Sequence, residues 1–534
     1  MKGKIILFIM ALFITSVLQA QNKSGTPQNP RPFRDITAVQ LVSEIKIGWN
    51  LGNSLETAPL TGTSQYWAKD GEWSTFSANP TVAQMETAWY SPITTKTTIT
   101  ALKNAGFNAI RIPVSWLKAA DSNQNIRADW MARVVEVVNY AVENDMYIIL
   151  NSHHDEMEHF DLSNKGVESS LIKYKKMWEQ IAFTFRNYDE KLIFEAFNEP
   201  RNSAKEPNEW TGLKESYNNL NKHYQAFVDI VRASGGNNDK RFLMVTPFAA
   251  FSRAGEINGL VIPKDTVQNK IIVSIHMYYP HNFTSDSGTD TWSKNKKNDT
   301  KPITDGIDLA YNTFVKKGIP VIIGEFGTVD KNNNTSARTE WSEFVASYAK
   351  NKSMPCFYWD DGDTYSIFNR VTNRFIYLEI FTAIMRGAGL STNMPAPVSN
   401  STASFLLTKR DWGWQFEQVF LDPLLFNING GKITQGDTYT FTYSFTSNAA
   451  MDYLQVILLD FGDSTNWKWN ELSSYVKIKE NIAANTVVSG SITIKAVKTA
   501  TNTNHRANRL VFQAGNGTKS APLLTFTRFE IKKE

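Results

Sequence analysis

Short apolar runs alternate with longer amphipathic stretches across residues 37–386, and this alternation constrains the fold more than any other feature of the sequence. The pattern is typical of βα units that build a parallel sheet. A doubly wound sheet would also produce it, but such sheets usually hold about six strands or fewer. The candidate strands are Ile45–Trp49, Ala109–Ile112, Tyr147–Asn151, Leu192–Phe197, Phe242–Thr246, Ile271–His276, Val321–Glu325 and Cys356–Trp359. Eight such runs predict a (β/α)8 barrel, also called a TIM barrel, over residues 37–390.

The pattern changes after the predicted barrel. Residues 391–403 are rich in Ser, Thr, Asn and Pro and predict a linker. Residues 404–534 show short alternating strands between turn residues, which predicts a smaller all-β sandwich. Paired tryptophans make this unit a candidate carbohydrate-binding module, although core tryptophans of a sandwich would give the same pattern. These tryptophans are Trp412, Trp414, Trp467 and Trp469.

The first residues have the pattern of a secretory signal. Lys2 and Lys4 precede an apolar run over residues 5–17, and Ala20 offers a small residue for cleavage. The run is short for a membrane span, so we expect a cleaved signal over residues 1–20 and no span afterwards. Residues 21–36 read as a flexible lead. Cys356 is the only cysteine, which rules out an intramolecular disulfide. We predict a bacterial protein that is secreted or periplasmic.

The charge distribution argues against a nucleic-acid partner. The formal net charge is +4 over 534 residues, and no basic block or stripe is present. The chain holds 15 Trp, 19 Tyr and 32 Phe, and flat aromatic rings match the C–H faces of sugars. Much of this aromatic load should be core, although carbohydrate sites also use such rings. We expect a monomeric protein.

Two of the apolar runs end in a glutamate. One ends in Asn198-Glu199-Pro200, where the proline cannot continue a strand, and the other ends in Gly324-Glu325. Catalytic residues of a barrel lie at the carboxyl ends of its strands. Glu199 and Glu325 are thus predicted to face each other as a pair of catalytic carboxylates.

Other predicted strands end in polar or aromatic side chains for which strand packing gives no reason. Arg111 and Tyr278, if they lie near Glu325, would keep it ionised as a nucleophile. Glu199 would then protonate the leaving oxygen and later deprotonate water, as in retaining glycoside hydrolysis. Glu195 is expected to be a structural, hydrogen-bonded carboxylate. The candidates at the strand ends are Arg111, His153, His154, Asn198, His276, Tyr278 and Trp359.

These motifs together resemble glycoside hydrolase family 5, of the retaining (β/α)8 clan. The resemblance rests on Arg111-Ile-Pro-Val-Ser115, Asn198-Glu199-Pro200, His276-x-Tyr278, Gly324-Glu325-Phe326-Gly327 and Trp359. It covers roughly residues 40 to 390. It implies Glu199 as acid/base, Glu325 as nucleophile and Trp359 as a platform for the sugar. The supporting residues that it implies are Arg111, His153, Asn198, His276 and Tyr278.

Three further motifs resemble the branch of endo-β-1,4-glucanases and xyloglucanases. They are Gly48–Ser54, Glu86–Trp89 and Asn151–His154, and they add Asn53 and Trp89 as candidate site residues. One departure is visible, because the chain has Trp89-Tyr-Ser-Pro92 where the branch usually has Trp-Gly-Asn-Pro. This change affects one wall of the cleft and leaves the exact polysaccharide open.

The sequence thus predicts a secreted endo-β-1,4-glucanase that cleaves a plant cell-wall β-glucan through a covalent glycosyl-enzyme intermediate, without a cofactor. Cellulose, xyloglucan, mixed-linkage glucan and β-mannan stay open as substrates. A catalytically silent glycan-binding protein is the alternative class, and the presence of both glutamates argues against it. His153, His154, Asp155 and His159 also suggest a metal site. Substrate hydrogen bonding explains the paired histidines and His159 has no clear ligand spacing, so we predict no metal.

Overall fold

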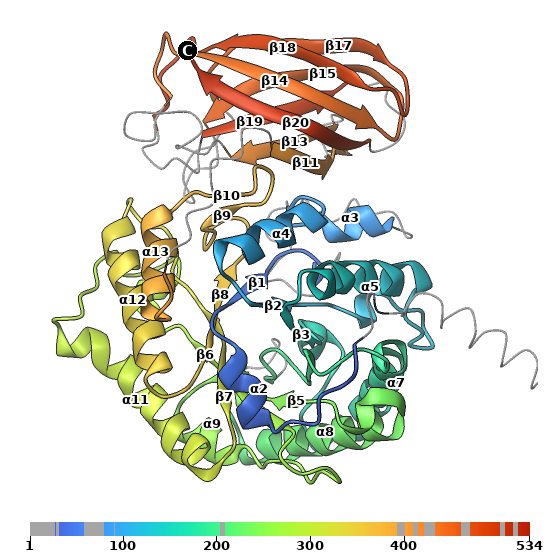
Figure 1. The fold of residues 1–534 in the computed structure, drawn as a ribbon, viewed down its shortest axis with the longest axis vertical. Helices are drawn as coiled ribbons and strands as arrows, with labels where there is room; N and C mark the ends of the chain where they lie inside the picture. Colours follow the sequence, from blue (N-terminus) through green and yellow to red (C-terminus); the bar gives the residue numbers. More distant parts are fainter. Residues whose placement is uncertain are drawn as a thin grey trace, which may run out of the picture.

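A computed structural model shows two folded parts, a barrel wrapped by helices and an all-β unit (Figure 1). Both were predicted from the sequence. The predicted signal at residues 1–20 lies outside the described residues. No helix among the described residues has the length and apolar character needed to cross a membrane. The structure describes residues 27, 31–57, 80–89, 91–202, 209–391, 401–409, 415–420, 433–460, 470–501, 508–515 and 522–534.

The first part is a closed parallel barrel in which each strand pairs with the next and the last pairs with the first. All of the predicted strands are present. The first begins at Gly48 instead of Ile45, because Ile45 caps the preceding helix and the Asn108 side chain accepts from the amides of Lys46 and Ile47. The strands are β1 (Gly48–Leu51), β2 (Ala109–Ile112), β3 (Tyr147–Asn151), β4 (Leu192–Glu195), β5 (Leu243–Val245), β6 (Ile271–Met277), β7 (Val321–Phe326) and β8 (Cys356–Asp360).

Helices surround the barrel (Figure 1). In α5, Val134, Val137 and Val138 are buried on one face, as their helical spacing predicts. The helices are α2 (Ala38–Glu44), α3 (Val82–Glu86), α4 (Lys96–Ala105), α5 (Ala128–Glu143), α6 (Asp155–Glu158), α7 (Val167–Phe185), α8 (Lys214–Ala233), α9 (Ala254–Gly259), α10 (His281–Thr284), α11 (Lys297–Thr313), α12 (Thr335–Lys350) and α13 (Leu378–Gly387). Short 3-10 turns are η3 (Leu117–Ala119), η4 (Gly236–Asp239), η5 (Phe248–Ala250) and η6 (Val315–Lys317), and a hairpin joins β9 (Phe368–Asn369) to β10 (Arg374–Phe375).

The barrel interior is apolar at the amino ends of the strands. Ala109, Ile149, Ile193, Ile322 and Phe357 form one buried cluster there, closed by apolar residues of α2. Side chains along a strand alternate between its two faces, so the residue two positions on also points inward. This alternation carries polar side chains into the interior at the carboxyl ends, where the site lies.

The close fit at the base of the barrel predicts a stability effect. A Cβ atom on Gly48 would lie 2.1 Å from Cδ1 of the buried Phe357 ring, which belongs to the paired strand. Gly48→Ala is therefore expected to lower the free energy of unfolding by about 1–3 kcal/mol, the usual cost of overpacking. Calorimetric unfolding would measure the loss. The matched control is Gly255→Ala in α9, where the nearest atom lies 3.5 Å away. Equal unfolding temperatures for the two variants would contradict the prediction.

The second part consists of two packed antiparallel sheets, as predicted for a sandwich. Burial alternates along β14, and rings such as Phe441, Phe512 and Phe529 fill the core between the sheets. β11 begins at Ser401, within the predicted linker 391–403. Trp412, Trp414, Trp467 and Trp469 lie outside the described residues. The strands are β11 (Ser401–Leu406), β12 (Thr408–Lys409), β13 (Gln415–Phe420), β14 (Thr438–Ser447), β15 (Met451–Asp460), β16 (Asn470–Glu471), β17 (Val476–Ile482), β18 (Val488–Lys495), β19 (Asn508–Ala514) and β20 (Leu523–Lys533).

Candidate active site

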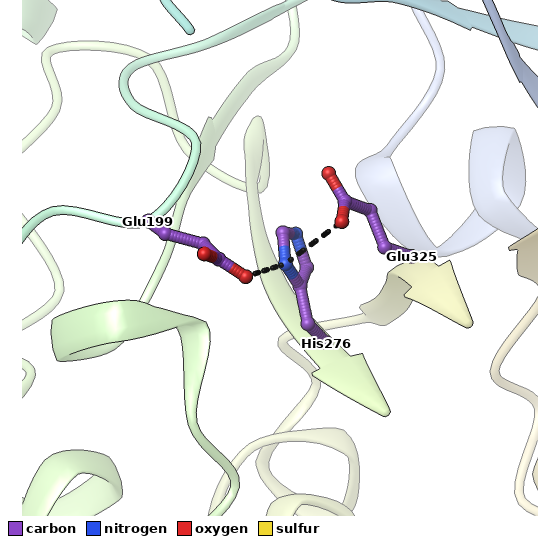
Figure 2. A group of neighbouring side chains, drawn as sticks. All are labelled: Glu199, His276 and Glu325. Atoms are coloured by element: carbon purple, nitrogen blue, oxygen red, sulfur yellow. Dashed lines mark hydrogen bonds and ion pairs between the residues drawn. The ribbon is translucent and has the colours of Figure 1, made fainter. Parts of the chain in front are cut away.

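The two predicted catalytic glutamates lie on either side of His276 (Figure 2). His276 Nδ1 is 2.8 Å from Glu199 Oε1 and 3.5 Å from Glu325 Oε2. One oxygen of each carboxylate and one nitrogen of His276 lie within 4.8 Å of one another. Glu199 follows β4, His276 lies in β6 and Glu325 lies in β7, so the fold brings together residues from three strands.

A β-bulge aims Glu325 into the barrel. Ile275 of β6 pairs with Ile323 of β7, but the next residue of β6, His276, pairs with Glu325. Gly324 is therefore left as an extra, unpaired residue in β7. The register between β7 and β8 shifts at the same place. Strict alternation from the inward Ile322 would turn Glu325 towards the helices. The extra residue reverses this, which is a common use of bulges beside active sites.

Arg111 holds four side chains of the site through three nitrogen atoms. Its Nη1 donates to Glu325 Oε1 at 2.6 Å and to Asn50 Oδ1 at 3.0 Å. Its Nη2 donates to Asn198 Oδ1 at 2.8 Å, and its Nε donates to Glu195 Oε2 at 2.6 Å. The Arg111 and Glu195 side chains are fully buried. Glu195 thus points into the barrel as the structural carboxylate that the sequence predicted.

Glu325 receives a second donor from Tyr278. The Tyr278 hydroxyl donates to Glu325 Oε2 at 2.9 Å, while Arg111 occupies the other oxygen. Asn151 adds support from β3, because its amide donates to Glu195 Oε2 at 3.1 Å and lies 3.3 Å from His153 Nδ1. The carboxylate of Glu325 is therefore fixed by two donors, Arg111 in β2 and Tyr278 directly after β6.

Different neighbouring groups act on the pKa values of the two glutamates. Burial raises the pKa of Glu199, and Arg201, Arg111 and His281 oppose this. Burial also raises the pKa of Glu325, against the lowering effects of His276, Arg111 and Tyr278. The charge of Glu199 adds to the raised pKa of Glu325, so the two carboxyl groups titrate as a coupled pair. Direct donation by Arg111 and Tyr278 favours the charged form of Glu325.

The histidines of the site are neutral near pH 7. Burial lowers the pKa of His276 to about 4, and it lowers the pKa values of His153 and His154 well below their ordinary value. A neutral His276 beside Glu199 can accept its proton in a hydrogen bond.

An aromatic row lines one side of the site. The Trp359 and His153 rings stack with centroids 5.8 Å apart and an interplanar angle of 10°. His154 meets His153 edge-on at 4.3 Å, and Trp89 lies 5.4 Å from His154. Gly52 packs so closely on the Trp359 indole that a Cβ atom there would lie 2.9 Å from it. The row brings together four residues that the sequence predicted.

The remaining predictions have mixed outcomes. Asn53 has a φ of 55°, and its backbone amide donates to Glu56, which gives it a contact within its own loop. The suggested metal cluster does not form. Asp155 instead accepts from the amides of Trp116 and Leu117, and among the described residues only Glu199, His276 and Glu325 gather closely enough for one cation. Arg111 and Tyr278 account for Glu325 without an ion.

Two charged neighbours of Glu199 were missed by the sequence analysis. Arg201 Nη1 lies 3.6 Å from Glu199 Oε2, and Glu156 Oε1 accepts from the amide of Glu199 at 3.3 Å. Arg201 directly follows Asn198-Glu199-Pro200, so its position in the sequence was a usable signal. Glu156 comes from α6, and only the fold shows that this helix reaches the end of β4.

A comparison with protein families shows to which family the chain belongs. A sequence profile described as Cellulase (glycosyl hydrolase family 5) matches residues 69–364, more than half of the chain. The chain belongs to glycosyl hydrolase family 5. The (β/α)8 barrel and the glutamates after β4 and in β7 agree with the resemblance on which the sequence predictions were based.

Several relatives of this family 5 protein cover much of its length. It is 40% identical over 389 residues to the cellulase/esterase CelE of Acetivibrio thermocellus, covering 71% of this chain but 44% of that protein. It is 35% identical to endoglucanase B of Clostridium cellulovorans, with coverage of 73% and 84% respectively. A GH5-4 broad specificity endoglucanase from Ruminococcus champanellensis, solved with cellotriose, is 42% identical and has a TM-score of 0.61. That match covers 66% of this chain and 100% of that structure.

Proposed function

We propose that this family 5 protein is a secreted, retaining endo-β-1,4-glucanase that hydrolyses internal bonds of a plant cell-wall β-glucan. The spacing of the two carboxylates carries the proposal, because one oxygen of Glu199 and one of Glu325 lie within 4.8 Å of each other. Retaining enzymes hold their carboxyl groups about 5–5.5 Å apart, whereas inverting enzymes leave about 6.5–9.5 Å for a water molecule. The present spacing supports direct attack by a carboxylate.

In the first step, a Glu325 oxygen attacks the anomeric carbon while Glu199 gives its proton to the leaving oxygen. The bond to the leaving sugar breaks, and an ester forms between Glu325 and the remaining glycan. In the second step, Glu199 takes a proton from water, the water oxygen attacks the same carbon, and the ester bond breaks. Glu199 ends the cycle protonated and Glu325 ionised, and the anomeric configuration is retained.

The neighbouring residues suit these roles. Arg111 and Tyr278 orient Glu325 and stabilise its charge. Asn198 offers its side-chain amide to a ring hydroxyl, while Arg111 fixes its carbonyl oxygen. The stacked Trp359 and His153 rings form a flat wall for a sugar ring. No step requires a cofactor.

The relatives support a β-glucan as the substrate. They include proteins described as endoglucanases and a lichenase from Caldicellulosiruptor sp. F32 that is 35% identical over 68% of this chain. We further propose that the sandwich binds the same polymer as a carbohydrate-binding module. The signal-like start of the sequence supports secretion.

The test of the reaction is sugar release from defined polymers. Xyloglucan, carboxymethyl cellulose, barley β-glucan and mannan would each be incubated with wild type and with Glu325→Gln. We expect reducing ends to appear from a glucan together with a rapid fall in viscosity, and NMR to show the β-anomer first. Release from mannan alone would overturn the substrate. Binding without release, by folded protein, would identify a silent glycan-binding protein.

Replacement of the acid/base predicts a result that depends on the leaving group. Glu199→Gln is expected to lower kcat/KM on a β-glucan by about 10²–10⁴-fold, because the departing sugar then leaves without a proton. With 2,4-dinitrophenyl β-cellobioside, the first step should stay nearly as fast, since dinitrophenolate needs no proton. Its second step should slow, because no base activates water. Stopped-flow absorbance would show a burst of dinitrophenolate, and equal losses on both substrates would contradict the assignment.

A further inference from the structure

Arg201 contacts the proposed acid/base twice. Its Nη1 donates to the backbone carbonyl of Glu199 at 3.1 Å and lies 3.6 Å from the carboxylate oxygen Oε2. Only 7% of Arg201 is exposed, so little water screens this charge. The proposed cycle gives Arg201 no bond to make or break, which leaves its contact with Glu199 unexplained.

Two contacts hold the Arg201 guanidinium in place. Its Nε donates to Glu209 Oε1 at 2.8 Å, and its Cζ lies 4.2 Å from the centroid of the Trp210 ring. An ion pair and a cation–π contact from the same loop fix both the plane and the position of the group. The distance between the guanidinium and Glu199 is therefore held by these two contacts.

Glu156 approaches Glu199 from another element. Its Oε1 accepts from the Glu199 amide at 3.3 Å, and its Oε2 is buried with no hydrogen-bond partner among the described residues. Only 2% of the residue is exposed. Burial raises the pKa of Glu156, and Arg201 opposes this by favouring the charged form. Glu199 is thus contacted by a fixed positive group at its side chain and by a buried acidic group at its backbone amide.

Other titratable or charged groups also act on Glu199. Arg111 and Glu325 are paired with each other, His276 is neutral near pH 7, and the Tyr278 hydroxyl donates to Glu325. His281 of α10 adds a weaker effect that favours the carboxylate. Arg111, His276, Tyr278 and Glu325 belong to the reaction centre. Arg201 and Glu156 take no other part in the proposed reaction, and both can influence the protonation of Glu199.

We propose that Arg201 and Glu156 are positioning residues that set the protonation of Glu199 in opposite directions. Arg201 favours the carboxylate, which the second step needs as a base. Glu156 favours the carboxylic acid, which the first step needs as a proton donor. The inference rests on the proposed function, in which Glu199 alternates between these two forms.

The pH dependence of kcat/KM on cellotetraose tests the proposal. Activity falls at high pH as Glu199 loses its proton, so this alkaline limb follows its pKa. Arg201→Met removes a positive charge, which should move the limb to higher pH by about 1 unit. Glu156→Gln keeps an acceptor for the Glu199 amide but cannot carry a negative charge at any pH, which should move the limb to lower pH by about 0.5 unit.

Three controls separate this effect from structural damage. Arg201→Lys keeps the charge and should keep the limb near its wild-type position, whereas a structural role would give Lys and Met the same profile. The profile for 2,4-dinitrophenyl β-cellobioside should not move in any variant, because its first step needs no proton. Calorimetry would confirm that each variant is folded.

The outcomes are distinct. Shifts of opposite sign on cellotetraose alone would support the proposal. An alkaline limb that does not move in Arg201→Met, or equal shifts on both substrates, would overturn the proposal. An alkaline limb that does not move in Glu156→Gln would show that Glu156 does not act on Glu199. Wild-type protein that releases no sugar from any substrate would instead overturn the proposed function.

Discussion

Glu325→Gln is expected to lower kcat/KM on a β-glucan by at least about 10⁴-fold, equivalent to about 5.5 kcal/mol of transition-state stabilisation. The amide cannot form the ester intermediate, so both steps of the double displacement are lost. Arg111 could still donate to the amide oxygen, and the Tyr278 hydroxyl could accept from the amide NH2, so the fold should persist. Initial rates of reducing-end release, beside a calorimetric scan, would measure both effects.

A small nucleophile can replace the missing carboxylate and so identify its role. Glu325→Gly in the presence of azide should turn over 2,4-dinitrophenyl β-cellobioside to the α-cellobiosyl azide, because one displacement inverts the anomeric carbon. Glu343→Gln is the matched control, since Glu343 is a half-buried carboxylate of α12 that pairs with Arg386. Wild-type rates in Glu325→Gln would overturn the assignment of the nucleophile.

Arg111→Met is expected to destabilise the barrel by about 3–5 kcal/mol, the usual result of removing one partner from a buried ion pair. Arg111 is fully buried between the carboxylates of Glu195 and Glu325, which would be left without their shared cation. The variant should also lose most of its activity, because Glu325 and Asn198 lose the donor that orients them.

Calorimetry of single and double variants would test this coupling. Glu195→Gln in the Arg111→Met background removes one of the stranded charges and should restore part of the lost stability. The surface pair offers a control, because Arg386→Met breaks only the exposed Arg386–Glu343 ion pair and should cost less than about 1 kcal/mol. Similar losses for Arg111→Met and Arg386→Met would contradict the prediction.

Much of the fold could be predicted because burial leaves a local pattern. A barrel strand is covered on both faces, so each appears as a short apolar run that stops where polar side chains begin. Asn198 and Glu199 were found in this way at the end of β4, and Trp359 at the end of β8. The limits of β1 were less visible, because the amides of Lys46 and Ile47 donate to the Asn108 side chain just before the ladder starts.

The site depends on contacts that no local pattern contains. The alternation of β7 taken alone would send Glu325 towards the helices, and the bulge opposite His276 turns it inward. Arg201 is adjacent to the motif in sequence, but its fixed distance from Glu199 comes from its contacts with Glu209 and Trp210.

The sequence by itself determined the order of strands and helices, the sandwich that follows, and the residues that stand at the strand ends. These follow from short-range alternation of apolar and polar side chains, which a single stretch of chain records. Only the tertiary structure decided which ends meet, how Arg111 links Glu195 to Glu325, and that Glu156 reaches Glu199. Those contacts join residues 43 to 214 positions apart, and the closed barrel fixes them because each strand is held by two neighbours.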